Sequence, residues 1–284
     1  MKLKLTALAG AAALALTSGY ASALVIPMSS GNSEMWFSVW DPVNLTSYTR
    51  DLGFFQNTLT TASVAGQTGV IQNTNGLSMQ FGPDALLTQF LADSAANLDK
   101  LRWNVAGGDG TGLAAGNRRI IVTAQENVTK TQIQNLASQQ MSNMISAADT
   151  YVNAVNSNTL GTHQTQDNGS HIEVMGDGLG NDNSYAGGGL WGPAFGGNGN
   201  FQNAGFLGDS LNFWWLSNGS SAIAKITATQ FLGLGGNVAT WTLANDGTLT
   251  FAAVPEAETW ALLGLGLLGV GALTRRRGRA LPLA

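Results

Sequence analysis

The sequence contains no cysteine, and only 11% of its 284 residues are charged. Without cysteine, no disulfide can stabilise a fold outside the cytoplasm and no thiol chemistry is available. Residues 24–253 are numerous enough for one large domain or two small ones, and they can bury a sizeable core. The stability of this body must therefore come from the burial of apolar side chains.

Positive charge is scarce in the body. Of the 17 acidic residues only Glu256 and Glu258 lie near the C-terminus, whereas six of the 13 basic residues lie in the two ends of the chain. Residues 24–253 thus carry 15 acidic and 7 basic side chains, a net charge of −8. An acidic, sparsely charged body disfavours nucleic acid and anionic lipid as partners.

Motifs for cofactors and metals are also lacking. There is no P-loop, no Rossmann glycine fingerprint after a strand, no EF-hand spacing and no His-Glu-x-x-His. A zinc site would need both histidines, His163 and His171, with a carboxylate such as Glu173, and we interpret the two as solvated loop histidines instead. The sequence predicts no cofactor and no metal.

One loop has side chains that could bind calcium. Residues 177–183 resemble a single turn of the calcium-binding nonapeptide repeats, and their side chains offer oxygen ligands from Asp177, Asn181, Asp182 and Asn183. Those repeats work as stacked copies, and no internal repeat occurs here. A loop without metal is favoured.

The N-terminal residues 1–23 have the composition of a secretory signal peptide. Lys2 and Lys4 precede an apolar stretch at residues 5–16, and small residues at Ala21 and Ala23 suit cleavage before Leu24. A permanent N-terminal anchor is the alternative, and the good cleavage site disfavours it.

The C-terminus has three parts in a fixed order. Val254, Pro255 and Glu256 precede an uncharged run at residues 260–273, and arginines follow at 275–277 and 279. As a helix the run would be about 21 Å long, shorter than the roughly 20 residues of a stable span, and its four glycines weaken it further. The arginines would stay on the cytoplasmic side. We expect a weak, temporary anchor; a helix buried in the fold is the alternative.

This tail resembles the PEP-CTERM sorting domain of Gram-negative bacteria. Val254, Pro255 and Glu256 match its Val-Pro-Glu-Pro-like start, and Arg275, Arg276 and Arg277 match its basic end, while Ala257 replaces the usual second proline. The resemblance implies cleavage near the motif by an exosortase, a membrane protease-transpeptidase. It also implies release to, or attachment at, the surface of cells that make exopolysaccharide.

Alternating patterns predict strands at both ends of the body. Residues 34–40 and 46–52 read as a hairpin, in which Met35, Phe37 and Val39 face one way and Trp36 and Trp40 the other. We expect further strands at residues 79–81, 101–105, 119–124, 211–216, 223–229, 238–243 and 248–253, with Asp246-Gly247 in the last turn.

Helices are expected between these strands. One begins at Pro83-Asp84 and runs to about residue 98, and the other covers residues 129–155, where Thr129 and Gln132 have the spacing of a capping box. The polar stretch 156–203 is interpreted as surface loops of one domain, because it contains Trp191, Phe195 and Phe201 and aromatic residues are rare in true linkers. A linker between two domains is the alternative. The pattern predicts an α+β, mainly β fold: an antiparallel β-sandwich-like body with a helical insertion, between a signal peptide and a C-terminal sorting helix.

Two motifs suggest activities. Residues 208–211 have the sequence of the nucleophile block of the GDSL esterases. However, both histidines precede Ser210, and Asp167 and His171 are four positions apart and not three, as the family's Asp-x-x-His pair requires. A turn that leads into a strand is therefore favoured. The eight tryptophans also suggest a glycan site. Trp36, Trp40 and Trp214 are the candidate contacts, although packing in the core is the stronger interpretation.

The sequence therefore predicts no catalytic residues and a non-enzymatic protein of the cell surface or extracellular matrix. The expected partners are an exosortase-type protease, the inner membrane transiently, and exopolysaccharide, as in a biofilm. A carbohydrate-binding module is the second interpretation and a secreted hydrolase the third.

Overall fold

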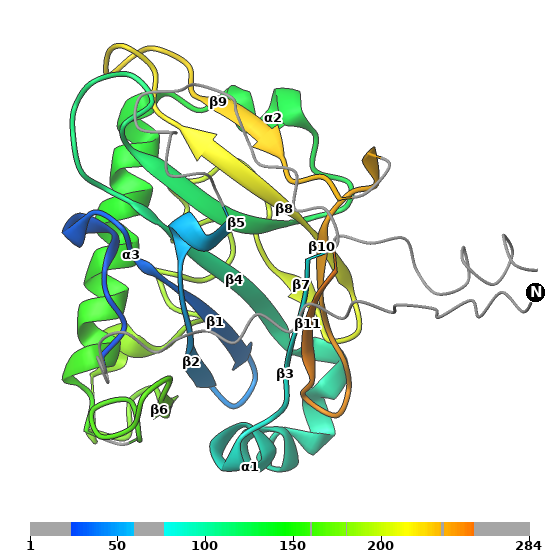
Figure 1. Ribbon diagram of the computed structural model, residues 1–284. Coiled ribbons are helices and arrows are strands. Elements are labelled where there is room, and N and C mark those ends of the chain that lie inside the picture. Colours follow the sequence, from blue (N-terminus) through cyan, green and yellow to red (C-terminus); the bar gives the residue numbers. More distant parts are fainter. Residues whose placement is uncertain (1–23, 60–76, 160, 180, 234–235, 253–284) are drawn as a thin grey trace, which may run out of the picture.

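The computed structural model describes residues 24–59, 77–159, 161–179, 181–233 and 236–252. Its strands join in one sheet in the order β3-β11-β10-β8-β5-β4-β1-β2-β6, with β7 also paired to β4 and β9 to β8 (Figure 1). Each strand pair is antiparallel. The strands are β1 (Glu34–Asp41), β2 (Thr46–Phe55), β3 (Ser78–Phe81), β4 (Arg102–Asp109), β5 (Arg119–Gln125), β6 (Ser170–Val174), β7 (Gly205–Phe206), β8 (Ser210–Ser217), β9 (Thr227–Gln230), β10 (Thr240–Leu243) and β11 (Leu249–Ala252).

Three α-helices lie among the described residues. They are α1 (Ala85–Asp93), α2 (Lys130–Gln134) and α3 (Ser138–Ser157). The same residues contain the short 3₁₀ helices η1 (Met28–Ser30), η2 (Gln56–Leu59), η4 (Ala95–Lys100) and η5 (Asp182–Ser184). The mainly β character expected from the sequence is confirmed.

Strand β1 lies inside the sheet, between β4 and β2, and is buried on both faces. Its side chains alternate as predicted: Met35, Phe37 and Val39 join one apolar cluster, and Trp36 and Trp40 join the other. The fold therefore has two cores, one on each face of a single sheet.

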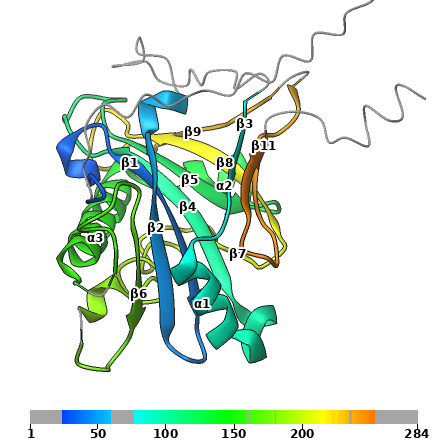
Figure 2. The same ribbon diagram turned by 60° about the horizontal axis from the view of Figure 1, so that its bottom comes forward.

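The first core fills the inside of a strong curl in the sheet (Figure 2). The ring of Phe81 in β3 stacks on Phe54 of β2, with 6.1 Å between centroids, and on Trp241 of β10, at 6.2 Å. Strands far apart in the sheet order thus meet across this core. Helix α1 closes it at one end, with Leu87 and Phe90 buried.

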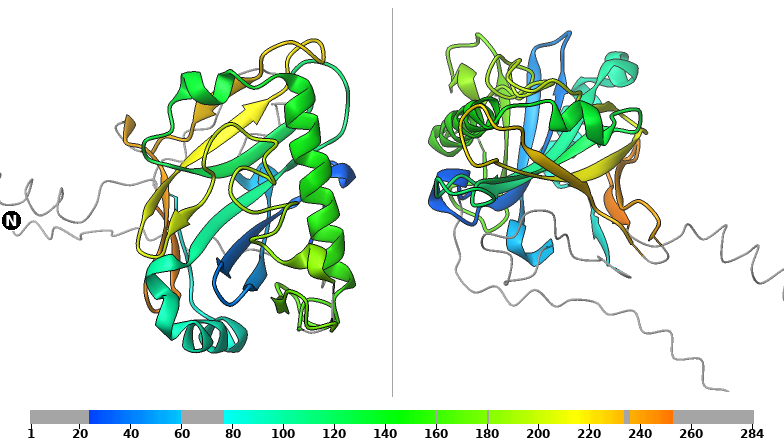
Figure 3. Two further views of the ribbon diagram at one scale, coloured as in Figure 1. Left: turned by 180° about the vertical axis from the view of Figure 1, so that it is seen from behind. Right: turned by 90° about the horizontal axis from the view of Figure 1, so that it is seen from above.

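The second core lies between the outer face of the sheet and α3, which crosses that face (Figure 3). Tyr151 of α3 stacks on Trp191, with 5.3 Å between ring centroids. Trp191 in turn meets Phe195 edge to face at 5.1 Å, and Phe201 is buried with them. The aromatic residues of the polar stretch 156–203 therefore pack beneath α3.

The two-layer sandwich expected from the sequence differs from the structure. The described strands belong to one curled sheet. The second layer is built from α3 and from the loop that carries Trp191, Phe195 and Phe201, here called the aromatic loop. Residues apolar on alternating faces occur both in a sandwich and in a sheet covered on both sides. The pattern alone does not distinguish these arrangements.

The helix expected at residues 129–155 is interrupted. Thr129 caps α2 as the spacing predicts, because its hydroxyl accepts the Gln132 N–H. Ala137 then pairs with Lys225 as an isolated β-bridge, and the Ile226 N–H donates to the Leu136 carbonyl at 3.1 Å. Extended pairing with a distant segment thus separates α2 from α3.

Strand β6 lies in the stretch 156–203 that was expected to form loops, and β7 lies just after it, where no strand was expected. Each is short, and β7 has only 2 residues. The expected signal peptide, with Ala21 and Ala23, lies outside the described residues, and so does the tail with Val254, Pro255, Glu256, Arg275, Arg276 and Arg277.

Candidate functional site

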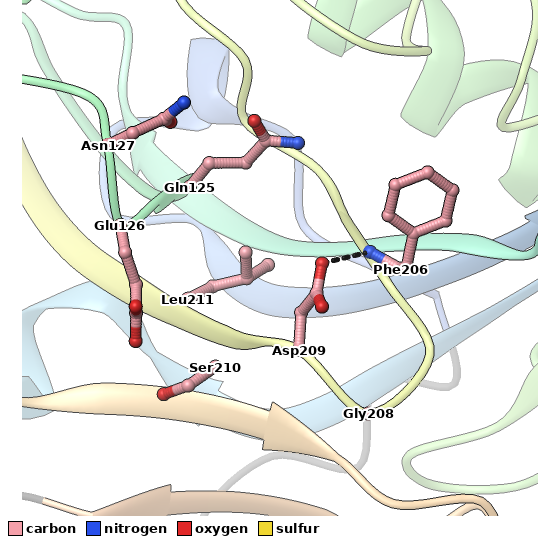
Figure 4. A pocket seen from close by; sticks show the side chains of 8 residues that line it. All are labelled: Gln125, Glu126, Asn127, Phe206, Gly208, Asp209, Ser210 and Leu211. Carbon is pink, nitrogen blue, oxygen red and sulfur yellow. Dashed lines mark hydrogen bonds between the residues drawn. The ribbon is translucent and has the colours of Figure 1, made fainter.

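The nucleophile-like block 208–211 forms a turn that leads into β8. Gly208 has a φ of +88°, which favours glycine, and the Asp209 carboxylate accepts the Phe206 N–H at 2.7 Å (Figure 4). Asp209 is therefore engaged as a turn residue. Ser210 is the first residue of β8.

Neither histidine lies near this serine. His171 is in β6, at the edge of the sheet, and β5, β4, β1 and β2 separate that strand from β8. His163 packs against His171, with 5.3 Å between ring centroids. The structure therefore does not bring together Ser210 and a histidine base, which a serine nucleophile requires.

The two histidines are buried, in contrast to the solvated loop residues expected from the sequence. Burial lowers the pKa of both imidazoles, and the neighbouring His163 helps to lower that of His171 to about 3. Gly169 makes room for His163, because a Cβ on Gly169 would lie 2.4 Å from the His163 Cα. Both rings are neutral packing elements at ordinary pH.

Glu173, the third residue considered for zinc, has other partners. Its Oε2 accepts hydrogen bonds from the Ser184 hydroxyl at 2.6 Å and from the Asn158 amide. Within the described part of the chain, no three or more His, Asp or Glu side chains are grouped so that they could hold a metal ion.

The loop considered for calcium turns its oxygens toward its own backbone. Asp177 Oδ1 accepts the Leu179 N–H at 2.7 Å, and Asp182 Oδ1 accepts the Gly176 N–H at 2.8 Å. These bonds are those of side-chain-capped turns. They account for the two aspartates of this loop.

A second buried pair joins Glu34 of β1 and Asp51 of β2. Burial and the neighbouring Glu34 raise the pKa of Asp51 to about 8, and burial also raises the pKa of Glu34. Each carboxyl group also accepts a hydrogen bond from the backbone. The Ile26 N–H donates to Glu34 Oε2 at 2.9 Å, and the Gly53 N–H donates to Asp51 Oδ1 at 2.7 Å. Nothing in the sequence indicated this pair, because its members are 17 positions apart and meet only through strand pairing.

The tryptophans proposed as glycan contacts are inside the protein. Trp36, Trp40 and Trp214 are each at most 4% exposed. Trp36 and Trp40 belong to β1, and Trp214 to β8, all on the face that α3 and the aromatic loop cover. Their ring faces are occupied by protein, so a sugar has no access to them.

A surface hollow lies beside the Asp209 turn. It has a volume of about 490 Å³ and lies between residues 125–127 on one side and residues 206–211 on the other (Figure 4). Phe206 at its border is 38% exposed.

Comparison with known protein families gives one match, in the tail. Residues 253–277 match the PEP-CTERM protein-sorting motif. The chain thus carries the sorting motif of an exosortase substrate, and this motif implies exosortase-dependent export to the cell surface.

No curated protein and no solved structure matches this chain. None of the helices in the described residues has the length and apolarity to span a bilayer. The expected short span at residues 260–273 lies outside that part of the chain.

Proposed function

We propose that this protein is a non-enzymatic component of the cell surface or extracellular matrix of a Gram-negative bacterium. Its tail holds it briefly in the inner membrane, an exosortase cleaves it near Val254-Pro255-Glu256, and the body is retained in exopolysaccharide, as in a biofilm. The sorting motif at residues 253–277 is the observation that carries this proposal.

The construction of the body supports an extracellular role. It lacks cysteine, and two apolar cores, one on each face of the sheet, provide its stability instead. Its low charge and net acidity suit a protein surrounded by hydrated polysaccharide rather than by nucleic acid.

A non-enzymatic role is supported by the positions of the polar side chains that chemistry would need. The Asp209 carboxylate accepts a hydrogen bond within a turn, and the buried His163 and His171 lie at the β6 edge of the sheet, which four strands separate from β8. The carboxylate is thus used within a turn, and the two imidazoles pack against each other away from Ser210.

Intact-mass analysis of the protein from its native host tests the proposal. We expect a species that ends close to Pro255, because the resemblance implies cleavage at that motif. The same analysis of a host that lacks the exosortase should give the full-length tail. A full-length tail in the wild-type host would overturn the proposal.

A further inference from the structure

The hollow between residues 125–127 and 206–211 has the size of a ligand site. Its volume of about 490 Å³ lies within the roughly 300–1,000 Å³ of small-molecule sites. The end of β5 and the two residues that follow it supply one wall, and β7, the turn before β8 and the start of β8 supply the other. Rigid strands therefore position both walls.

Phe206 gives this hollow an aromatic surface. Among the large hydrophobic side chains that are exposed in the described residues, it is the only aromatic one, since all tryptophans there are buried. The Arg102 guanidinium lies over its ring, 3.2 Å from the centroid, and the Trp103 indole N–H donates to its carbonyl at 2.7 Å. Arg102 thus covers one face of the ring, and Phe206 is among the residues that line the hollow.

The other lining groups are polar. Glu126 and Asn127 are exposed, and the Ser210 hydroxyl and the Asp209 carboxylate lie across from them. The Gln125 amide is held by a bond from Nε2 to the Ala204 carbonyl at 2.9 Å. Carboxylates accept hydrogen bonds from hydroxyls, and amides both accept and donate.

We propose that this hollow binds a neutral hexose unit of a polysaccharide, an assignment that rests on the proposed role in exopolysaccharide. A hexose has an apolar C–H face that suits an aromatic ring, and hydroxyls at its rim that suit carboxylates and amides. Glu126 and Asp209, together with the net charge of −8 of the body, repel uronic acids and other anionic sugars.

Affinity electrophoresis of the purified full chain tests this site. The probes are three neutral polysaccharides, namely dextran, laminarin and galactomannan, and one anionic polysaccharide, alginate. We expect at least one neutral polysaccharide to retard the wild-type protein and alginate to leave its mobility unchanged.

Three variants at two positions locate the binding. Phe206→Ala should weaken it at least tenfold, and Phe206→Tyr should retain it, because the phenol ring keeps the aromatic face. Glu126→Gln should weaken it about threefold to tenfold, because the side chain is exposed and the change removes one strong acceptor.

Matched controls lie elsewhere on the surface. Leu113 is 80% exposed beside a second hollow of about 270 Å³, and Asp99 is an exposed carboxylate. Leu113→Ala and Asp99→Asn should bind as the wild type does, and circular dichroism should show every variant folded.

Three results would overturn the site. They are no retardation by any neutral polysaccharide, a preference for alginate, or full binding by folded Phe206→Ala. The intact-mass experiment is independent of all three, so a failure of sorting and a failure of sugar binding can be told apart.

Discussion

The hydroxyl of Tyr151 in α3 and the hydroxyl of Ser38 in β1 are hydrogen-bonded at 3.0 Å inside the protein. The Thr49 hydroxyl of β2 joins the same contact. Burial raises the pKa of Tyr151 well above its ordinary value, so the phenol remains protonated. This polar contact positions the long helix on two neighbouring strands.

Replacing Tyr151 by Phe should destabilise the protein by about 1–3 kcal/mol, because two buried hydroxyls lose a partner while the stacking on Trp191 remains. Urea unfolding at pH 7 measures the change. The double variant Tyr151→Phe/Thr49→Val should recover part of the loss, since it removes a polar group that the single variant leaves without its partner. A single variant as stable as the wild type would show that the contact is energetically neutral.

The Glu34–Asp51 pair should make stability fall as pH rises. The pKa of Asp51 is raised from about 3.8 to about 8, so the folded state binds more protons than the unfolded chain between these values. The stability that this proton contributes is fully present below pH 4 and is lost as pH rises through 8.

Asp51→Asn removes this dependence, because the amide oxygen can still accept the Gly53 N–H. We expect the variant to gain stability relative to the wild type between pH 5 and pH 9, as measured by urea midpoints at both values. Asp99→Asn, a change at an exposed carboxylate, is the control. Parallel pH curves for wild type and Asp51→Asn would contradict the assignment.

The buried histidines should act in the opposite direction. Burial and the neighbouring His163 lower the pKa of His171 from 6.5 to about 3, so the unfolded chain binds more protons than the folded state between these values. Stability is therefore lost as pH falls from 6.5 toward 3.

His171→Gln should reduce this loss of stability at low pH. The measurement is the difference in unfolding free energy between variant and wild type, taken at pH 6.5 and at pH 4. Comparison at equal pH cancels the contribution of the Glu34–Asp51 pair. The variant can be less stable at pH 6.5, but the difference should shrink at pH 4. A difference that stays constant would mean that His171 titrates normally.

Cleavage should depend on Glu256 more than on Glu258. Both are glutamates in the same short segment, and only Glu256 belongs to the Val254-Pro255-Glu256 motif. We expect Glu256→Ala to lower the processed fraction at least tenfold in the native host, and Glu258→Ala to leave it within about twofold. Intact mass of the cell-associated protein gives both fractions, and equal processing would remove Glu256 from the recognised motif.

Much of the β framework could be predicted from local pattern. The hairpin of β1 and β2 and the hairpin of β10 and β11 follow from alternating apolar residues around turn residues. Asp84 caps α1 as the Pro83-Asp84 start indicates, with its carboxylate accepting the Leu87 N–H at 2.8 Å. These features depend on neighbours in the sequence, so the sequence contains their cause.

The candidate site could not be predicted in the same way. The tryptophans suggested a sugar surface, but strands covered on both faces bury them, and the exposed ring is that of Phe206 in a two-residue strand. A strand of that length leaves no periodicity to detect. Its position depends on pairing with Arg102 and Trp103, about a hundred residues earlier in the chain.

The sequence by itself determined the sorting tail, because a motif read by a protease in the membrane acts through local composition and order, and the family comparison confirms it at residues 253–277. Only the tertiary structure decided which polar and aromatic side chains are accessible. Glu34 meets Asp51, His163 meets His171, and Phe206 faces solvent because a single curled sheet brings distant segments together and covers both of its faces. Burial is a property of that packing, and local sequence does not specify it.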